Sequence, residues 1–455
     1  MKKDLIIVGA GNYGRIAYEK LGKDSNIIAF ADNDETKQGK SFCNIEIIPV
    51  SNICRYLEGD VDIVVATAAY VSIGRQLKLL GINNYYVMLN GHIFNSHNRI
   101  KGKICRCNRC VMDDSSDDNI LFDANGFCNY CTESLSIKDG IYYPNSIGES
   151  KLSDALSVIK EHGRNGKYDC IMGISGGLDS SYLAYLGYKW GLRVLAVHID
   201  DGFDTDISAN NIKRLIDKTG FEYRIIKPNA KQYCDLVLSY MKAGVPNLAV
   251  PQDNCLFAFL YETMRKNDIK YFLPGGNYAL ESILQKGNTH SAFDVANIYD
   301  IHNKFGIENI DELQFISRKQ IKEDTEKWGI ESPRLLNYIN YNRDSALKEL
   351  NEFCGFEYYG SKHLENELTA FIQLYWFYNK FGVDKRTSHL SSMIISGQMT
   401  REAAITELSK PLCDEALLGL YIKDVTTKLG ITMDELEKLM KEAPHSHNEY
   451  EHDED

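Results

Sequence analysis

Residues 175–180 read Ser-Gly-Gly-Leu-Asp-Ser and carry the strongest chemical signal in this sequence. The apolar run before them predicts a buried strand, and the leucines after them recur at helical spacing. Glycines let the backbone approach a phosphate closely, and the first N–H groups of a helix have no partner within the helix. Ser175 and Ser180 would add hydroxyl donors. Asp179 suits such a site if Mg²⁺ bridges its carboxylate to the phosphates.

This motif resembles the signature of the PP-loop (N-type) ATP pyrophosphatases. The resemblance implies that ATP is cleaved between its α and β phosphates and that a carbonyl oxygen of the substrate is adenylated. The alternative is a glycine turn that leads into an ordinary helix. Because the chain lacks G-x-x-x-x-G-K-[ST], the sequence gives no support for a P-loop kinase or GTPase.

Alternating strand and helix patterns around this motif predict a parallel sheet with helices on both faces. Ligands of such sheets bind beyond the carboxyl ends of the strands, where three segments of this chain are expected to converge. The alternative for Asp200 is a turn cap. The residues predicted to bind ATP or pyrophosphate are Ser175, Gly176, Gly177, Leu178, Asp179, Ser180, Asp200, Gly275, Gly276 and Asn277, and Asp179, Ser180 and Ser175 are the predicted catalytic residues.

Two C-x-x-C pairs form the second chemical signal. Their spacing, C-x₂-C-x₁₇-C-x₂-C, is typical of a structural zinc site. Four thiolates would leave no open position on the metal, so such a zinc would stabilise the fold and would not catalyse. An iron–sulfur cluster, a redox or sulfur-transfer pair and plain buried thiols are the alternatives. The predicted ligands are Cys107, Cys110, Cys128 and Cys131.

The chain begins with a strand-like run, the glycine pattern G-x-G-x-x-G and a helical run, which together predict a βαβ nucleotide-binding unit. The stretch resembles the N-terminal domain of sugar acyltransferases of the PglD type, which implies that it holds a nucleotide sugar. NAD binding and a purely structural role remain alternatives. The candidate ligand-binding residues are Gly9, Gly11, Asn12, Gly14 and Asp32.

The length, charge and overall composition limit which kinds of protein this chain can be. The chain has 455 residues, enough for about three domains. Its 63 acidic and 51 basic residues give a net charge of −12, which argues against broad contact with nucleic acid. The N-terminus does not read as a signal peptide and no apolar run reaches membrane-spanning length, so we expect a cytoplasmic protein with reduced thiols and no membrane contact. The sequence leaves homo-oligomerisation open.

The C-terminal part is predicted to be helical and rich in aromatic residues. It contains a cluster of basic residues that would meet a diphosphate or a carboxylated sugar, or else form surface ion pairs. These residues are Lys385, Arg386, His389 and Arg401. The last residues are acidic and rich in histidine without apolar content, which predicts a disordered tail.

The expected fold class is α/β with five segments. Residues 1–95 form a small Rossmann-like domain, residues 96–150 a linker and the cysteine knuckle, and residues 151–320 the PP-loop domain with its parallel sheet. Residues 321–443 form a helical region, and residues 444–455 the tail.

Four motifs occur in one order along the chain: the cysteine knuckle, Ser-Gly-Gly-Leu-Asp-Ser, Gly-Gly-Asn, and Phe-Gly-Val-Asp-Lys-Arg with Ser-Gly-Gln-Met-Thr-Arg-Glu. Together they resemble the N-acetyl sugar amidotransferases of the WbpG/PseA group, and the likeness covers about residues 104–440. The resemblance implies that ATP, with Mg²⁺, adenylates the acetamido oxygen of a nucleotide-activated N-acetyl sugar and that ammonia from a separate glutaminase subunit displaces AMP. It places the enzyme in bacterial surface glycan biosynthesis, including lipopolysaccharide and pseudaminic acid pathways. The sequence does not name the sugar, its nucleotide (UDP or CMP) or the general base.

Two other functions are consistent with parts of the sequence. A tRNA-modifying PP-loop enzyme of the thiolation or lysidine type also pairs this loop with cysteine knuckles, but the net acidity and the lack of a basic domain argue against it. A non-catalytic nucleotide-sugar-binding protein would require an inert Ser175 loop, which the intact motif disfavours.

Overall fold

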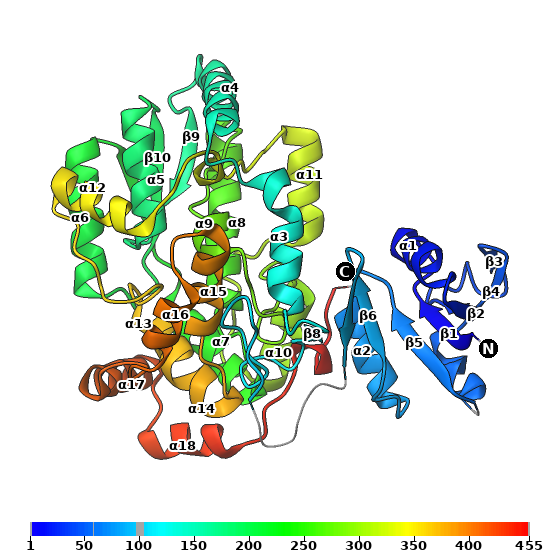
Figure 1. The fold of residues 1–455 in the computed structure, drawn as a ribbon. Helices are drawn as coiled ribbons and strands as arrows, with labels where there is room; N and C mark the ends of the chain where they lie inside the picture. The colour runs from blue at the N-terminus through cyan, green and yellow to red at the C-terminus, as the bar shows by residue number, and fades with distance from the viewer. Residues whose placement is uncertain (1, 58, 97–103, 454–455) are drawn as a thin grey trace. The chain divides into compact units, whose positions relative to one another are not determined.

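The computed structural model describes residues 2–57, 59–96 and 104–453. The chain divides into two compact units, the first made of residues 1–138 with 283–287 and the second of residues 139–282 with 288–455 (Figure 1). The cysteine knuckle therefore groups with the N-terminal sheet, and the sheet that precedes α5 shares one unit with the helical C-terminal region. Most of the linker predicted at the start of residues 96–150 lies outside the described residues.

The first unit is built on an eight-stranded sheet of order β3-β4-β2-β1-β5-β6-β7-β8. Strands β4, β2, β1, β5 and β6 pair in parallel, and the remaining pairings are antiparallel. The strands are β1 (Lys3–Val8), β2 (Ser25–Ala31), β3 (Ser41–Phe42), β4 (Ile45–Ile48), β5 (Val61–Val65), β6 (Tyr86–Leu89), β7 (His92–Asn95) and β8 (Phe122–Asp123), with η1 at Val50–Tyr56.

Both faces of this sheet are apolar, as expected for a sheet covered on each side. Along β1, Ile6 and Val8 pack in one cluster with Leu77 of α2 (Tyr70–Leu79). Leu5 and Ile7 pack in another with Ala17 of α1 (Asn12–Leu21). Successive side chains of a strand point to opposite faces, so the two helices cover opposite sides of the sheet.

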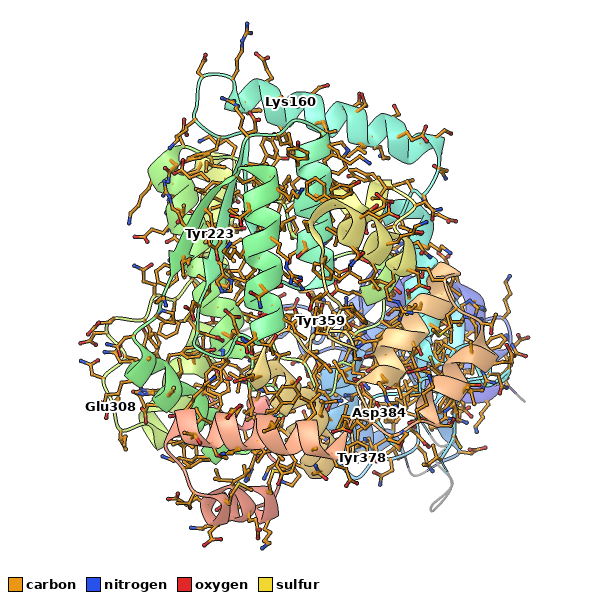
Figure 2. All side chains as sticks on the ribbon, turned by 90° about the vertical axis from the view of Figure 1, so that its left-hand side faces the viewer. Lys160, Tyr223, Glu308, Tyr359, Tyr378 and Asp384 are labelled. Carbon is orange, nitrogen blue, oxygen red and sulfur yellow. The ribbon has the colours of Figure 1, made fainter. Side chains whose placement is uncertain are left out.

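The second unit contains a parallel sheet of order β11-β10-β9, with β9 (Cys170–Gly173), β10 (Val194–Ile199) and β11 (Glu222–Ile226). A parallel bridge from Ile171 to Phe272 continues this sheet on the far side of β9. Tyr223 on the edge strand β11 and Lys160 on α4 are labelled in Figure 2. The α/β class, with a parallel sheet and a helical C-terminal region, is therefore confirmed.

Helices surround the sheet and make up the rest of this unit. Among the described residues, none of the helices combines the length and apolar character needed to cross a membrane. The helices are α3 (Asn129–Ile141, which begins in the first unit), α4 (Ser146–Gly163), α5 (Leu178–Lys189), α6 (Asp206–Thr219), α7 (Ala230–Ala243), α8 (Val250–Asn267), α9 (Tyr278–Glu281), α10 (Val295–Phe305), α11 (Arg318–Trp328), η2 (Leu335–Tyr338), α12 (Arg343–Cys354), α13 (Glu367–Phe371), η3 (Ile372–Trp376), α14 (Phe377–Phe381), α15 (Arg386–Ser396), α16 (Arg401–Leu408), α17 (Glu415–Leu429), α18 (Met433–Lys441) and η4 (His447–Glu449).

Residues 444–453 are folded, whereas the sequence predicts a disordered tail over residues 444–455, the last two of which lie outside the described residues. This segment packs on the second unit, where the His447 ring is buried and stacks on His290 with ring centroids 4.3 Å apart. Asn297 donates to the His447 and Glu451 carbonyls. Burial lowers the pKa of His447 well below its usual range, so the ring is neutral. Composition does not reveal this segment because few of its residues are apolar: one aromatic ring, Tyr450, packs on the core, and hydrogen bonds and the His447 stack hold the rest.

Candidate active site and cysteine cluster

The Ser-Gly-Gly turn joins β9 to α5 through a backbone that only glycine tolerates. Gly176 has φ +76°, and a Cβ there would lie 2.5 Å from the Ser208 carbonyl oxygen. A Cβ on Gly275 would lie 3.0 Å from the Ser180 nitrogen, so the second glycine loop also packs closely against this turn. Two glycine loops that are far apart in sequence thus meet at the start of α5.

Hydroxyl groups surround the first N–H groups of α5. The Gly177 N–H donates to Ser175 Oγ at 3.2 Å, and the Leu178 N–H donates to the Tyr359 hydroxyl at 3.0 Å. Ser175 Oγ and Ser180 Oγ lie 3.1 Å apart. Tyr359 lies near the centre of the view in Figure 2. A helix N-terminus with additional hydroxyl donors is suited to binding an anion.

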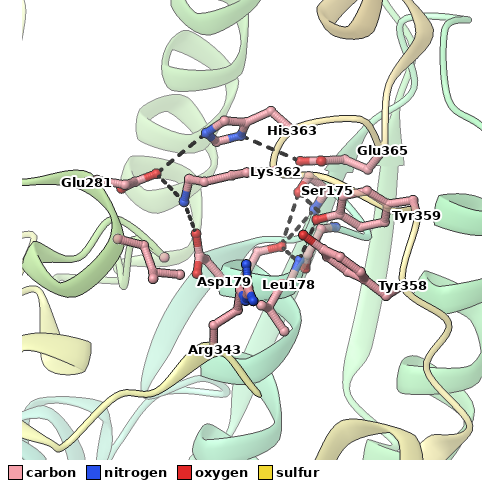
Figure 3. A pocket seen from close by; sticks show the side chains of 14 residues that line it. Ser175, Leu178, Asp179, Glu281, Arg343, Tyr358, Tyr359, Lys362, His363 and Glu365 are labelled. Atoms are coloured by element: carbon pink, nitrogen blue, oxygen red, sulfur yellow. Dashed lines mark hydrogen bonds and ion pairs between the residues drawn. The ribbon is translucent and has the colours of Figure 1, made fainter. Parts of the chain in front are cut away.

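A pocket of about 170 Å³ opens at this helix start (Figure 3). It brings the predicted phosphate loop together with α9, the start of α12 and the loop that leads to α13. The lining residues are Ser175, Gly177, Leu178, Asp179, Ser180, Gly275, Leu280, Glu281, Arg343, Tyr358, Tyr359, Lys362, His363 and Glu365.

Lys362 bridges two carboxylates in this pocket. Its Nζ lies 2.6 Å from Asp179 Oδ2 and 3.0 Å from Glu281 Oε1 (Figure 3). The Tyr341 hydroxyl donates to the other oxygen of Asp179. Burial alone would lower the pKa of Lys362, but the charges of Asp179 and Glu281 outweigh it and raise that pKa. Lys362 is therefore a charged ammonium held between two acidic side chains.

His363 and Glu365 lie on the same loop and have perturbed pKa values. Burial and the nearby Lys362 charge lower the pKa of His363 to about 3, so its ring is neutral. Its backbone is in the left-handed region at φ +64°, which is strained for a residue other than glycine. Burial raises the pKa of Glu365 to about 7. The loop thus brings a carboxyl group that titrates near neutral pH to the Ser-Gly-Gly turn.

The structure brings most of the predicted ATP-binding residues together but separates Asp200 from them. Asp200 forms an ion pair of 2.6 Å with Lys227 and lines a different recess, together with His198 and Asp204. Asn277 is buried and caps α9, accepting a hydrogen bond from the Leu280 N–H at 2.9 Å. Gly176 and Gly276 do not line the pocket, although each belongs to a loop that shapes it.

Sequence reasoning counted the two tyrosines of the loop of residues 358–365 among the aromatic residues of the C-terminal part but missed its charged residues. It supplies Tyr358, Tyr359, Lys362, His363 and Glu365 to the pocket. The composition of this loop could have pointed to the site, because it combines tyrosines with a lysine, a histidine and a glutamate between two helices. Loops on a rigid scaffold often carry functional residues.

The four basic residues predicted to meet the sugar have different surroundings. Arg386 pairs with Asp384 at 2.7 Å and donates to three backbone carbonyls of residues 407–411, so its guanidinium serves the fold. Lys385 lies over the Phe377 ring, and Arg401 is the first residue of α16. His389 packs beside a residue of the pocket, with its ring centroid 5.4 Å from that of His363.

The four predicted zinc ligands form one buried cluster. Their sulfurs all lie within 4.8 Å of one another, with Cys107 to Cys131 at 3.8 Å and Cys110 to Cys128 at 3.6 Å. Four sulfurs about 2.3 Å from a central zinc ion would be about 3.8 Å apart in a regular tetrahedron. The N–H groups of Cys110 and Cys128 point at Cys107 Sγ. The donor set and its geometry fit a structural zinc ion.

The N-terminal glycine pattern is explained first by packing. A Cβ on Gly14 would lie 1.9 Å from the Gly9 carbonyl oxygen, and Gly9 has φ +115°. Asp32 accepts the Ala10 N–H at 2.8 Å and pairs with Lys37 at 3.2 Å. Gly11 and Asn12 stand at the start of α1, where a Cβ on Gly11 would meet open space. Nucleotide-sugar binding by this unit stays a prediction.

Comparison with known proteins finds one similar sequence and several solved structures with a weak likeness. The uncharacterized protein MJ1599 of Methanocaldococcus jannaschii is 23% identical over 312 residues, which are 67% of this chain and 94% of that protein. The NH3-dependent NAD synthetase of Campylobacter jejuni is 16% identical, with a TM-score of 0.24, over 50% of this chain and 96% of that chain. The Rex-family repressor RSP is 20% identical, with a TM-score of 0.17, and the match spans 20% of this chain and less than half of that protein, 46%.

Two family models match the ends of the chain. Residues 1–88 match the model described as C2185-like, N-terminal. Residues 365–454, which begin at Glu365 of the pocket and include the folded C-terminal segment, match the C-terminal domain of the LPS biosynthesis protein WbpG-like family.

Proposed function

We propose that this protein is an ATP-dependent amidotransferase that converts an acetamido group of a nucleotide-activated N-acetyl sugar into an acetamidino group. The observation that carries the proposal is the pocket at the start of α5, where Asp179, Glu281 and Lys362 face the Ser-Gly-Gly turn. The match of the C-terminal residues to the WbpG-like domain supports a substrate from surface polysaccharide biosynthesis.

The triphosphate of ATP would lie on the turn and the start of α5. Asp179 and Glu281 would hold Mg²⁺, because their oxygens already bind one cation, the Lys362 ammonium. When bound, Mg²⁺ offsets the charge of the phosphates. Lys362 would then turn from the carboxylates to the phosphate chain, and the hydroxyls of Ser175 and Ser180 would donate to the same oxygens.

The chemistry follows from the weak reactivity of an amide. Its carbonyl is a poor electrophile, and its oxygen is a poor leaving group. Attack of the acetamido oxygen on the α phosphorus breaks the bond to the bridging oxygen, and pyrophosphate leaves. Ammonia then adds to the activated carbon, and AMP departs with the former acetamido oxygen. A separate glutaminase subunit would supply the ammonia, and the site must exclude water at this stage.

The other metal and the N-terminal unit would have supporting roles. Cys107, Cys110, Cys128 and Cys131 would hold a structural zinc ion that leaves no position for substrate. The N-terminal unit would bind a nucleotide sugar, which fits its glycine-rich helix start but leaves Asp32 as a cap for Ala10.

A product assay tests this function. The protein is incubated with ATP, Mg²⁺, ammonium and a panel of UDP- and CMP-linked N-acetyl sugars, and both nucleotide and sugar are followed by mass spectrometry. We expect AMP, pyrophosphate and a sugar in which NH replaces one acetamido oxygen. AMP formation only with tRNA and a sulfur donor would contradict the proposed reaction and favour a tRNA-modifying enzyme.

Lys362→Met is expected to lower the rate of AMP formation by about 10²-fold, because it removes one cationic partner of the phosphates. It also leaves Asp179 and Glu281 adjacent without a counter-charge. Steady-state AMP release measures the effect. The control is Lys348→Met, an exposed lysine on α12 that pairs only loosely with Glu352 at 3.9 Å. Equal rates for both variants would show that Lys362 does not act in the reaction.

A further inference from the structure

The Glu365 carboxyl group lies directly over the phosphate loop. A Cβ built on Gly177 would be 2.5 Å from Glu365 Oε1 and 3.1 Å from Ser175 Oγ. The Thr205 N–H and hydroxyl donate to the Glu365 carbonyl, each at 3.1 Å, and fix its backbone beside the turn. Glu365 therefore occupies the space next to the position where the proposed function places a phosphate.

One oxygen of this carboxyl group has no partner. Oε2 of Glu365 is buried and accepts no hydrogen bond within the part of the chain that the structure describes. A buried ionised carboxylate normally binds several donors, so an unpaired oxygen is costly. If the group were a neutral carboxylic acid whose O–H donates a hydrogen bond to a ligand oxygen, this oxygen would have a partner.

The groups that face Glu365 come from two segments, its own loop and the start of α5. Tyr359 and Lys362, which lie on the same loop, favour the ionised form of the carboxyl group and lower its pKa. Asp179 of α5 adds negative charge, and His363 Nδ1 lies 4.0 Å from Glu365 Oε1. Burial raises the pKa of Glu365 to about 7, with Lys362 and Asp179 acting in opposite directions. The carboxyl group is thus poised to change its protonation state near neutral pH.

We propose that Glu365 is a ligand of the polyphosphate chain that takes up one proton when the chain binds. This inference rests on the proposed function, since it requires ATP on the Ser175 loop. A carboxylate beside several phosphate charges is repelled, so phosphate binding favours the protonated form. The neutral carboxylic acid then donates a hydrogen bond to a phosphate oxygen, and the proton comes from solvent. No covalent bond to Glu365 forms or breaks.

Isothermal titration calorimetry tests the inference with the full chain and α,β-methylene ATP, an analogue that cannot be cleaved between the α and β phosphates. Titrations with Mg²⁺ at about pH 8 in buffers of different ionisation enthalpy give the number of protons taken up. We expect on the order of one proton for the wild type, because the carboxyl group is mostly ionised before binding and protonated afterwards. For Glu365→Gln, which imitates the protonated group, we expect binding without this uptake.

The pH dependence of affinity provides a second readout. Between about pH 7.5 and 9, wild-type affinity is expected to fall up to tenfold per pH unit, and the affinity of Glu365→Gln is expected to change much less. Glu357→Gln is the matched control. Glu357 lies in the same segment between α12 and α13, but its carboxylate forms an ion pair of 2.6 Å with Arg214 and does not line the pocket. This variant should behave like the wild type.

Two results would overturn the inference, and they differ. If the wild type and Glu365→Gln bind the analogue with equal proton uptake, Glu365 is not the group that titrates, while the proposed ATP site stands. If the folded wild type does not bind the analogue at all, the proposed ATP site itself fails, and this inference fails with it.

Discussion

Asp179→Asn is expected to lower the rate of ATP cleavage by at least about 10³-fold and to leave the fold intact. Asparagine keeps the shape of the side chain and one acceptor for Tyr341, but it loses the charge that holds Lys362 and would hold Mg²⁺. Preorganised charge at a phosphoryl-transfer site is usually worth several kcal/mol. The measurement is single-turnover formation of AMP from ATP with saturating sugar and ammonium.

Asp200→Asn is the matched control for this prediction. Both aspartates follow a strand of the same sheet, but Asp200 pairs with Lys227 outside the pocket. We expect its rate to stay within a few-fold of the wild type. Circular dichroism shows whether both variants are folded. A loss of activity in Asp200→Asn that equals the loss in Asp179→Asn would mean that the pocket has been assigned to the wrong strand end.

Cys128→Ser is expected to abolish zinc binding and to unfold the first unit at ordinary temperature. All four sulfurs are completely buried, and β8, which belongs to the knuckle, pairs with β7 of the sheet. Zinc binding by such sites is worth about 10–16 kcal/mol in isolated fingers, as much as the whole stability of a typical domain. Metal analysis should find one zinc per wild-type chain and none in the variant.

Cys54→Ser is the control, because Cys54 is exposed and lies outside the cluster. Differential scanning calorimetry of the full chain should show the transition of the first unit lost in Cys128→Ser and unchanged in Cys54→Ser. A wild-type protein that contains iron and inorganic sulfide instead of zinc would contradict the structural zinc site. So would a Cys128→Ser variant that melts like the wild type.

The sequence predicted the local parts of the site well. The strand, turn and helix around Ser175 follow from an apolar run, two glycines and leucines at helical spacing, all of which are short-range features. The cysteine cluster also follows from spacing, because a C-x-x-C knuckle presents its two thiolates locally and the second knuckle needs only a turn to return to it.

The parts that were missed depend on long-range contacts. Lys362 and Asp179 are 183 residues apart, and no periodic pattern connects an irregular loop with a helix start. Asp200 shows the converse problem. The rule that strand ends converge places it near the site, but its ion pair with Lys227, the residue just after β11, directs it to a separate recess. In both cases the position of the side chain depends on its ion-pair partner, and the pattern of strands and helices in the sequence does not show that partner.

The most direct test of the proposed reaction follows one oxygen atom. A nucleotide-linked N-acetyl sugar that carries oxygen-18 in its acetamido group is incubated with the protein, ATP, Mg²⁺ and ammonium. If the acetamido oxygen attacks the α phosphorus at the Ser175 loop, the label appears in AMP, and the sugar product carries nitrogen in its place. Label that stays in the sugar, or ATP that yields only ADP and phosphate, would contradict the account.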